Sequence, residues 1–275
     1  MEIKLFLDKD INENANFYFE KAKKLKAKLP GLEKATEQTQ KEISELEANK
    51  EKHMARKEKE EKIKVHKKKE WYEKFRWTFL SSGHLLVMGK DSVTNEILVK
   101  KHMEENDIVF HTQAPASPFG IVKDGKEIEK EKEILMEAAS MVANFSSQWK
   151  KGFGTADAFW VYPEQISKTA NSGEFMSKGS FMIRGDKNII KNLPTLICLG
   201  IRKIKIKTDN EEIEIEEGFS GSLPACQKFC GTRFVKLEPG DLNYKKLNKE
   251  LKTKLKFSFE DLPKLIPNNC KILKR

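Results

Sequence analysis

Residues 160–188 combine side-chain types that bind a polyanion, without the paired groups that covalent catalysis requires. The segment carries hydroxyls and glycines together with the cations Lys168, Arg184 and Lys187. Hydroxyl and backbone N–H groups hold phosphate oxygens, and lysine and arginine add an attraction that weakens with salt. Because no nucleophile stands beside a base at a catalytic spacing, we expect this segment to bind a ligand rather than to break bonds.

Aromatic side chains accompany these cations. Trp160 and Tyr162 could stack on unpaired bases at about 1 to 3 kcal/mol per base, but Trp160 between Phe159 and Val161 fits a protein core equally well. His111 ends an expected strand before a proline-containing loop, so we also consider it for the site. The cations and aromatics expected at an RNA surface are Trp149, Trp160, Tyr162, Lys168, Arg184 and Lys187, with Lys100, Lys101 and Lys123 as neighbours.

Other site chemistries have little support in the sequence. Cys226 and Cys230 lie four residues apart without a second matching pair, so we expect the four cysteines to be buried free thiols rather than zinc ligands. Phosphate-binding nucleotide motifs, a hydrolase elbow and histidine runs with metal-ligand spacing are all absent. We therefore expect a protein without enzyme activity, metal or cofactor.

The charge balance favours an anionic partner. Lysine and arginine outnumber aspartate and glutamate by 52 to 42, which gives a net charge of +10. This favours RNA, DNA or an anionic membrane surface, although a lysine-rich proteome would give the same balance. Since the sequence shows no apolar leader and no apolar stretch of about 18 residues, we expect a soluble cytoplasmic protein that does not insert into membranes.

Residues 1–69 are expected to form a helical arm. Apolar residues at three- and four-residue steps predict a helix that ends at Pro30-Gly31, and a near-heptad pattern from Leu32 predicts a second helix. Residues 57–69 are almost wholly charged, which predicts a solvated tip. Such a coiled-coil arm would reach a partner or form a dimer; the alternative is a helix packed on its own domain.

The remaining sequence predicts an α+β fold with a mixed or antiparallel sheet and a long helix packed against it. Trp71, Phe75 and Phe79 at four-residue spacing predict a helix that turns these rings into the core. We expect residues 70–206 to form one folded domain, to which the family resemblance described below gives an RNA-binding role, and residues 207–275 to form a small basic extension. Further helices are predicted at 95–103, 129–149 and 244–255, and strands at 84–88, 108–111, 120–123, 158–162, 180–184, 196–200, 201–207, 213–215 and 234–237.

The chain resembles a known family, the NFACT-R RNA-binding domain of ribosome quality-control factors, which includes archaeal homologues long labelled fibronectin-binding. The resemblance covers about residues 67–200 in the family's order and spacing. It implies that Gln165, Ser167, Thr169 and Gly185 belong to the RNA-binding surface as well. The matching stretches are residues 69–77, 89–91, 95–100, 107–111, 160–162, 165–169 and 180–185.

The resemblance implies a role on the large ribosomal subunit carrying an obstructed nascent chain, with tRNA or rRNA as partner. Residues 14–24 are similar to the entry of the family's coiled-coil arm. The resemblance therefore leaves three interpretations open: a carboxy-terminal piece, a stand-alone version, or a split-gene product whose partner is a separate amino-terminal half. Residues 112–117 replace the family's usual Ala-Asp-x-His-Gly pattern. Two alternatives stay open: a tRNA-binding adaptor in tRNA modification, and a coiled-coil interaction protein without RNA affinity.

Overall fold

The computed structural model describes residues 4–6, 8, 10–48, 69–114, 116–167, 181–207 and 212–273. Two compact units divide the chain, residues 1–67 and residues 68–275. Lys168 and Thr169, both expected to bind RNA, lie outside the described residues, as does the charged tip of the arm up to Lys68. The α+β fold class predicted from the sequence is confirmed.

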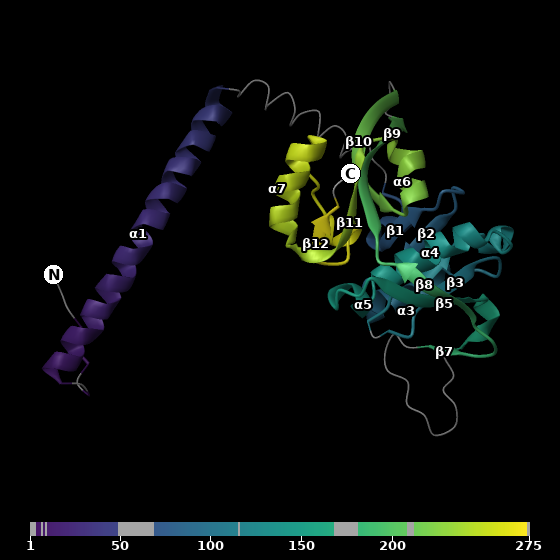
Figure 1. The fold of residues 1–275 in the computed structure, drawn as a ribbon, viewed down its shortest axis with the longest axis horizontal. Coiled ribbons are helices and arrows are strands. Elements are labelled where there is room, and N and C mark those ends of the chain that lie inside the picture. Colours follow the sequence, from purple (N-terminus) through teal and green to yellow (C-terminus); the bar gives the residue numbers. More distant parts are fainter. Residues whose placement is uncertain are drawn as a thin grey trace. The chain divides into compact units, whose positions relative to one another are not determined.

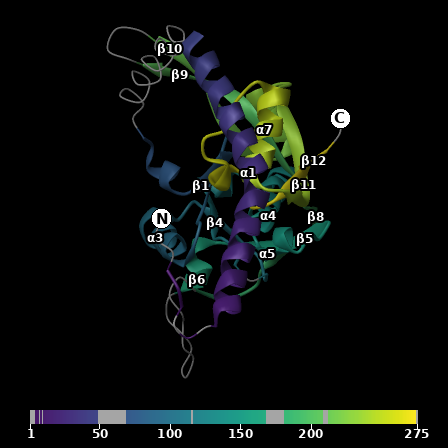
Figure 2. The ribbon, with the colours of Figure 1, turned by 90° about the vertical axis from the view of Figure 1, so that its left-hand side faces the viewer.

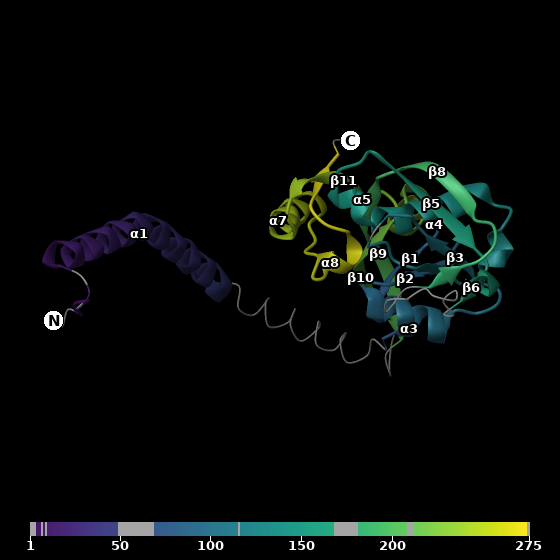
Figure 3. The ribbon, with the colours of Figure 1, turned by 90° about the horizontal axis from the view of Figure 1, so that it is seen from below.

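The first unit contains one long helix, α1 (Ile11–Ala48), so the predicted break at Pro30-Gly31 is wrong. Asp10 caps the helix, because its carboxylate accepts the Glu13 N–H at 2.7 Å and the Glu13 carboxylate accepts the Asp10 N–H at 3.1 Å. Proline removes one backbone hydrogen bond and bends a helix, but the helix-forming residues on both sides keep the remaining bonds. Figure 3 shows α1 bent along its length.

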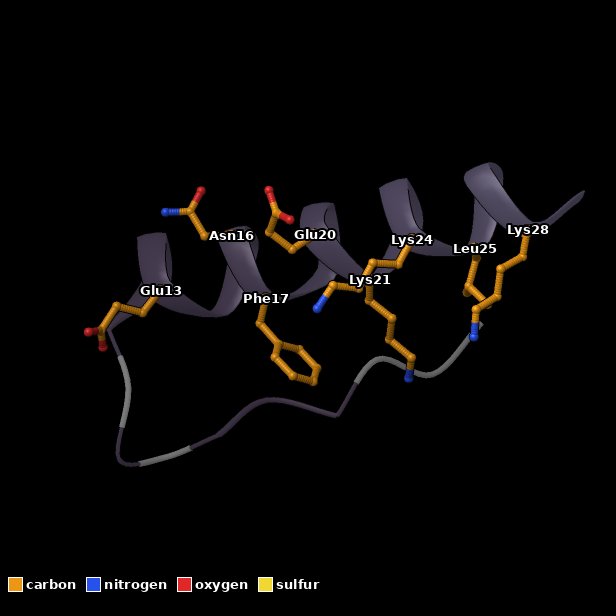
Figure 4. A pocket seen from close by; sticks show the side chains of 8 residues that line it. All are labelled: Glu13, Asn16, Phe17, Glu20, Lys21, Lys24, Leu25 and Lys28. Carbon is orange, nitrogen blue, oxygen red and sulfur yellow. The ribbon is translucent and has the colours of Figure 1, made fainter. Parts of the chain in front are cut away.

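The start of α1 holds the amino-terminal segment. The Asn14 side chain accepts the Phe6 N–H at 2.8 Å and donates to the Phe6 carbonyl at 3.0 Å, and the rings of Phe6 and Phe17 meet edge to face. A shallow pocket beside these turns is lined by residues of α1, including Phe17, Lys21 and Leu25 (Figure 4). Leu25 and other apolar residues of α1 are exposed, and pairing of the arm in a coiled coil stays a prediction.

The second unit begins with a short 3-10 helix, η1 (Trp71–Lys74), followed directly by strand β1 (Arg76–Phe79). The predicted helix over Trp71, Phe75 and Phe79 is therefore wrong. Strand β1 pairs with β2 (Leu85–Met88) in an antiparallel register that places Arg76 opposite Met88. Phe75 is buried, but Trp71 keeps 37% of its surface exposed. The four-residue spacing arose from a turn joined to a strand, which local periodicity cannot distinguish from a helix.

Six antiparallel strands form the first sheet, in the order β1-β2-β4-β3-β5-β8. The remaining strands are β3 (Ile108–His111), β4 (Gly120–Val122), β5 (Thr155–Val161) and β8 (Asn188–Pro194). Side chains alternate between the two faces, so Leu86 and Met88 join one core cluster and Val87 joins the other. Figure 1 shows this sheet with the second sheet beside it.

A helix covers each face of the first sheet. Helix α3 (Ser92–His102) begins at a capping box of Asp91 and Thr94, and its Leu98 and Val99 pack on one face. Helix α4 (Lys132–Asn144) packs on the other face. The predicted helix 129–149 is interrupted after Asn144, because Ser146 caps a new short helix, α5 (Ser147–Lys150). Two 3-10 helices, η2 (Gly125–Ile128) and η3 (Pro163–Gln165), and the hairpin β6 (Ile166–Ser167) and β7 (Met182–Ile183) complete this part.

The carboxy-terminal residues form a second antiparallel sheet, in the order β10-β9-β11-β12. The predicted domain boundary at 206/207 falls inside β9 (Ile197–Lys207), which runs through the two strands predicted at 196–200 and 201–207. The other elements are β10 (Glu212–Gly221), α6 (Leu223–Cys230), β11 (Phe234–Leu242), α7 (Tyr244–Leu255), α8 (Leu262–Leu265) and β12 (Cys270–Ile272). Figures 1 and 2 both show α7 beside β11 and β12.

The two sheets share one hydrophobic core. Residues of α4, of β9 and of α7 belong to the same buried cluster. Polar bonds join the sheets too: the Thr78 hydroxyl donates to the Ser220 carbonyl at 2.6 Å, and the Trp149 indole donates to the Asn269 carbonyl at 3.0 Å. Since apolar burial of this kind is the main force in folding, residues 68–275 form one compact unit.

Candidate nucleic-acid interface

The Gln165 side chain fixes the turn that carries Arg184, Gly185 and Lys187. Its carbonyl accepts the Tyr162 N–H at 2.9 Å, and its amide donates to the carbonyls of Arg184 at 2.9 Å and Asp186 at 2.8 Å. Gly185 has φ +74°, a left-handed conformation that glycine adopts without strain. The structure therefore assigns Gln165 a positioning role: it holds the backbone from which the two cations project.

Arg184 and Lys187 are both exposed, and Lys187 lies on the α3 side of the first sheet. The Lys187 ammonium lies 4.7 Å from the centre of the buried Phe159 ring, a cation–π contact worth about 0.5 to 1 kcal/mol when exposed. Among the described residues, no carboxylate forms an ion pair with Arg184 or Lys187. Both charges are therefore open to an anionic partner.

His111 lies beside this pair of cations but remains neutral near pH 7. Its ring packs 4.5 Å from Phe119 and 6.0 Å from Phe159, centroid to centroid. Burial lowers the pKa of His111 to about 4, backbone hydrogen bonds oppose this shift, and the nearby Lys187 charge adds to it. His111 therefore shapes the aromatic floor under Lys187 and adds no positive charge to the surface.

The carboxyl end of α3 carries Lys100 and Lys101, both exposed. The Lys100 ammonium forms an ion pair with Glu96 one turn earlier, at 2.7 Å. Beside them His102 stacks on the Trp71 ring at 4.3 Å, and His102 has a lowered pKa owing to burial and the nearby lysines. Trp71 was predicted to lie in the core, but its ring is partly exposed beside these lysines. The lysines that precede Trp71 in the sequence were an available signal of this exposure.

Lys123 contributes its charge inside the protein. Its ammonium lies 2.8 Å from the Asp107 carboxylate, 2.7 Å from Glu104 and 3.0 Å from the His102 carbonyl. Asp107 is fully buried and the Lys123 side chain is only 16% exposed. Burial raises the pKa of Asp107. Burial alone would lower the pKa of Lys123, but the hydrogen bonds to the carboxylates of Asp107 and Glu104 outweigh it and raise that pKa. Lys123 was predicted to lie near the RNA surface. In the structure its charge pairs with carboxylates of the protein itself, so its role is to stabilise the fold.

Trp160 and Tyr162 lie on the α4 side of the sheet, away from Arg184 and Lys187. Trp160 is 9% exposed and belongs to the main core, so its ring is not placed to stack on a base. Tyr162 is half-buried and meets the Trp160 ring edge to face at 5.3 Å. A hydrogen bond to Glu129 and, to a smaller extent, burial raise the pKa of Tyr162 to about 12. The alternative interpretation of Trp160 as a core residue is the one that the structure supports.

The rest of the predicted segment is described only in part. Ser167 is half-buried in β6 and pairs in register with Met182 of β7. Lys168 and Thr169 follow it and lie outside the described residues. The structure therefore brings Gln165, Gly185, Arg184 and Lys187 together, with His111 near Lys187. It places the side chains of Lys123, Trp160 and Tyr162 elsewhere, although the Tyr162 backbone contacts Gln165.

The four cysteines are buried free thiols, as predicted. Burial raises the pKa of Cys270 to about 12, which keeps this thiol protonated and unreactive. Within the described part of the chain, no three His, Cys, Asp or Glu side chains gather where they could hold a metal ion. None of the helices in the described residues combines the length and the apolar composition needed to cross a membrane.

Comparison with known proteins identifies the relatives of this fold. Residues 74–185 match the NFACT protein RNA binding domain. The chain is 38% identical over 219 residues to the archaeal Rqc2 homolog aRqcH of Methanocaldococcus jannaschii, covering 78% of this chain and 31% of the relative. It is 30% identical over 219 residues to the ribosome quality control complex subunit NEMF of Mus musculus, covering 76% of this chain and 19% of the relative. The chain thus spans about a third or less of the length of these relatives.

Proposed function

Because residues 74–185 belong to the NFACT RNA-binding domain family, we propose that this chain is an RNA-binding factor of ribosome-associated quality control. In this proposal it binds the large ribosomal subunit, tRNA, or both, where a nascent chain has stalled. It acts in the cytoplasm, without a catalytic step or cofactor.

The observation that carries the proposal is the pair of exposed cations on a fixed turn. Arg184 and Lys187 project from a backbone that Gln165 holds through hydrogen bonds of 2.8 to 2.9 Å. A guanidinium and an ammonium at such a turn attract phosphate oxygens, and phosphate contacts position a protein on RNA without reading its sequence. The function supported by this arrangement is backbone binding.

Aromatic stacking would add to these phosphate contacts on the same face of the domain. Trp71 is partly exposed and lies against His102, and the α3-side core includes Tyr72, next to Trp71, as well as Ile183, next to Arg184. A base stacked on an aromatic ring contributes about 1 to 3 kcal/mol and needs no particular sequence. We therefore propose Trp71, rather than Trp160, as the ring on which a base stacks.

The test is the salt dependence of RNA binding by an Arg184→Ala/Lys187→Ala variant. Each phosphate contact contributes about 0.7 to 0.9 to the slope of log affinity against log salt. We expect the double variant to bind a labelled tRNA transcript more weakly, with a slope reduced by about one to two. Fluorescence anisotropy at several salt concentrations measures both quantities.

A Lys130→Ala/Lys132→Ala variant is the matched control, since both lysines are exposed and Lys132 begins α4 on the opposite face. An equal loss in both variants would show a net-charge effect and contradict the proposed placement. Co-sedimentation with large ribosomal subunits separates the alternatives. Binding to free tRNA alone would favour an adaptor in tRNA modification, and no RNA binding by the wild-type chain would favour a coiled-coil interaction protein.

A further inference from the structure

Helix α7 presents a row of lysines on the side that faces away from the core. Its buried face consists of Leu247, Leu251 and Leu255, which belong to the main core. The opposite side is exposed and almost uniformly cationic. Exposed lysines of this helix and its end are Lys245, Lys246, Lys249, Lys252, Lys254 and Lys256.

Three of these lysines lie along one line. Lys245, Lys249 and Lys252 follow one another at steps of four and three residues, which places them on one side of a helix of 3.6 residues per turn. At 1.5 Å per residue, they span about 10 Å with roughly one charge per turn. Lys256 adds a fourth charge directly after the last residue of α7, where its backbone is left-handed (φ 55°). This is an extended strip of positive charge rather than a single point.

In the described part of the chain, no acidic side chain forms an ion pair with the row. Among the described residues, none of the ion pairs involves a lysine of α7. Glu250, the one acidic residue on α7, lies on another side of the helix, where its charge acts on the buried Cys270. Like charges one turn apart destabilise a helix by about 0.2 to 0.5 kcal/mol per pair, so the leucine face must offset this repulsion.

We propose that this lysine row is a second RNA-backbone surface, outside the segment that matches the family. Phosphate groups match it in charge and in linear arrangement. A membrane surface fits less well, because an interfacial helix inserts an apolar face, and here that face is buried in the protein core. The inference rests on the proposed function only in taking RNA, rather than an acidic polypeptide, as the anion.

The test compares two variants that each lose four positive charges. In the first, Lys245, Lys249, Lys252 and Lys256 are replaced by glutamine, which retains much of the aliphatic stem. The control replaces Lys203, Lys205, Lys264 and Lys271, which form ion pairs with Glu214, Glu212, Asp261 and Glu238. Binding of a labelled tRNA transcript is measured between about 50 and 200 mM salt.

We expect the α7 variant to lower the slope of log affinity against log salt by about three, and the control by less than about one. Replacing the same four lysines by arginine should restore the wild-type slope, which a mere folding defect would not allow. Equal slopes in wild type and the α7 variant, or equal losses in both quadruple variants, would overturn the inference. So would displacement of RNA by polyglutamate at an equal charge concentration, which would favour an acidic polypeptide as the partner.

The outcome also separates this inference from the proposed function. If the Arg184→Ala/Lys187→Ala variant lowers the slope and the α7 variant does not, only the α7 surface is wrong. If the α7 variant alone lowers the slope, the placement of RNA on the turn between β7 and β8 is wrong and the α7 surface stands. A wild-type chain that binds no RNA would overturn both.

Discussion

The β9–β10 hairpin and helix α7 are both rich in lysine, but they use its charge in opposite ways. In the hairpin, lysines on β9 face glutamates on β10, and Lys203 and Lys205 lie 2.7 and 3.2 Å from Glu214 and Glu212. On α7, the exposed lysines have no such partners among the described residues. The pairing of charges, rather than the number of lysines, therefore decides where a polyanion is attracted.

Lys123 extends this comparison to the interior. There the charge stabilises the fold, because Asp107 is fully buried and needs a counter-charge. Three environments for lysine thus occur in one compact unit: buried and paired, exposed and paired, and exposed without a pair. Each environment predicts a different response to substitution, and the responses differ in size.

The largest expected effect follows removal of the buried charge. A Lys123→Met variant leaves the Asp107 carboxylate buried with only its two backbone N–H donors, so we expect a loss of about 3 kcal/mol or more in the free energy of unfolding. Urea denaturation measures the loss. The exposed Lys101→Met serves as the control, with an expected change within about 0.5 kcal/mol. Similar stabilities for both variants would mean that Lys123 is not the internal counter-charge.

The next effect concerns His111, whose ring stays neutral near pH 7 whereas the lysines are positively charged. The pKa of His111 is about 4 in the folded protein, against an ordinary value of 6.5. The unfolded chain therefore binds the proton first, and folding stability contributed by the neutral ring is lost as the pH falls from about 6.5 to 4. We expect the wild type to lose up to about 3 kcal/mol more over this range than a His111→Gln variant.

Stability curves of the two proteins between pH 7 and pH 4 provide the measurement. Using the difference between them removes the contribution of carboxylates that titrate in the same range. Parallel curves for wild type and variant would show that His111 is protonated equally in the folded and unfolded states, and it would then count among the cations of the surface.

The smallest effect tests the paired charges of the hairpin. A Lys203→Glu/Lys205→Glu variant sets like charges across β9 and β10, and we expect a loss of about 1 kcal/mol that shrinks at high salt. Adding Glu212→Lys/Glu214→Lys should recover most of the loss. A quadruple variant no more stable than the double variant would show that these cross-strand pairs contribute nothing measurable.

The helices and strands were predictable where one face is apolar and the other polar. Strand Ile108–His111 and helix Tyr244–Leu255 have the predicted bounds, because burial of one face fixes their period. The prediction failed at Trp71–Phe79 and at Pro30, where the outcome depends on a strand partner or on the summed strength of neighbouring helical bonds. The candidate site was predicted as a set of cations, hydroxyls and aromatic rings, and the structure brings only part of this set together.

From the sequence alone, the net positive charge, the α+β class and the family resemblance of this protein followed, since each depends on residue types and their order. Only the tertiary structure decided that Lys123 forms an ion pair with Asp107, and that Trp160 is buried while Trp71 is partly exposed. The same holds for the hydrogen bonds by which Gln165 fixes the turn of Arg184 and Lys187. These outcomes depend on residues distant in sequence becoming neighbours. A charged side chain can bind a partner only when no group within the fold already neutralises it, and an aromatic ring only when the fold leaves it exposed.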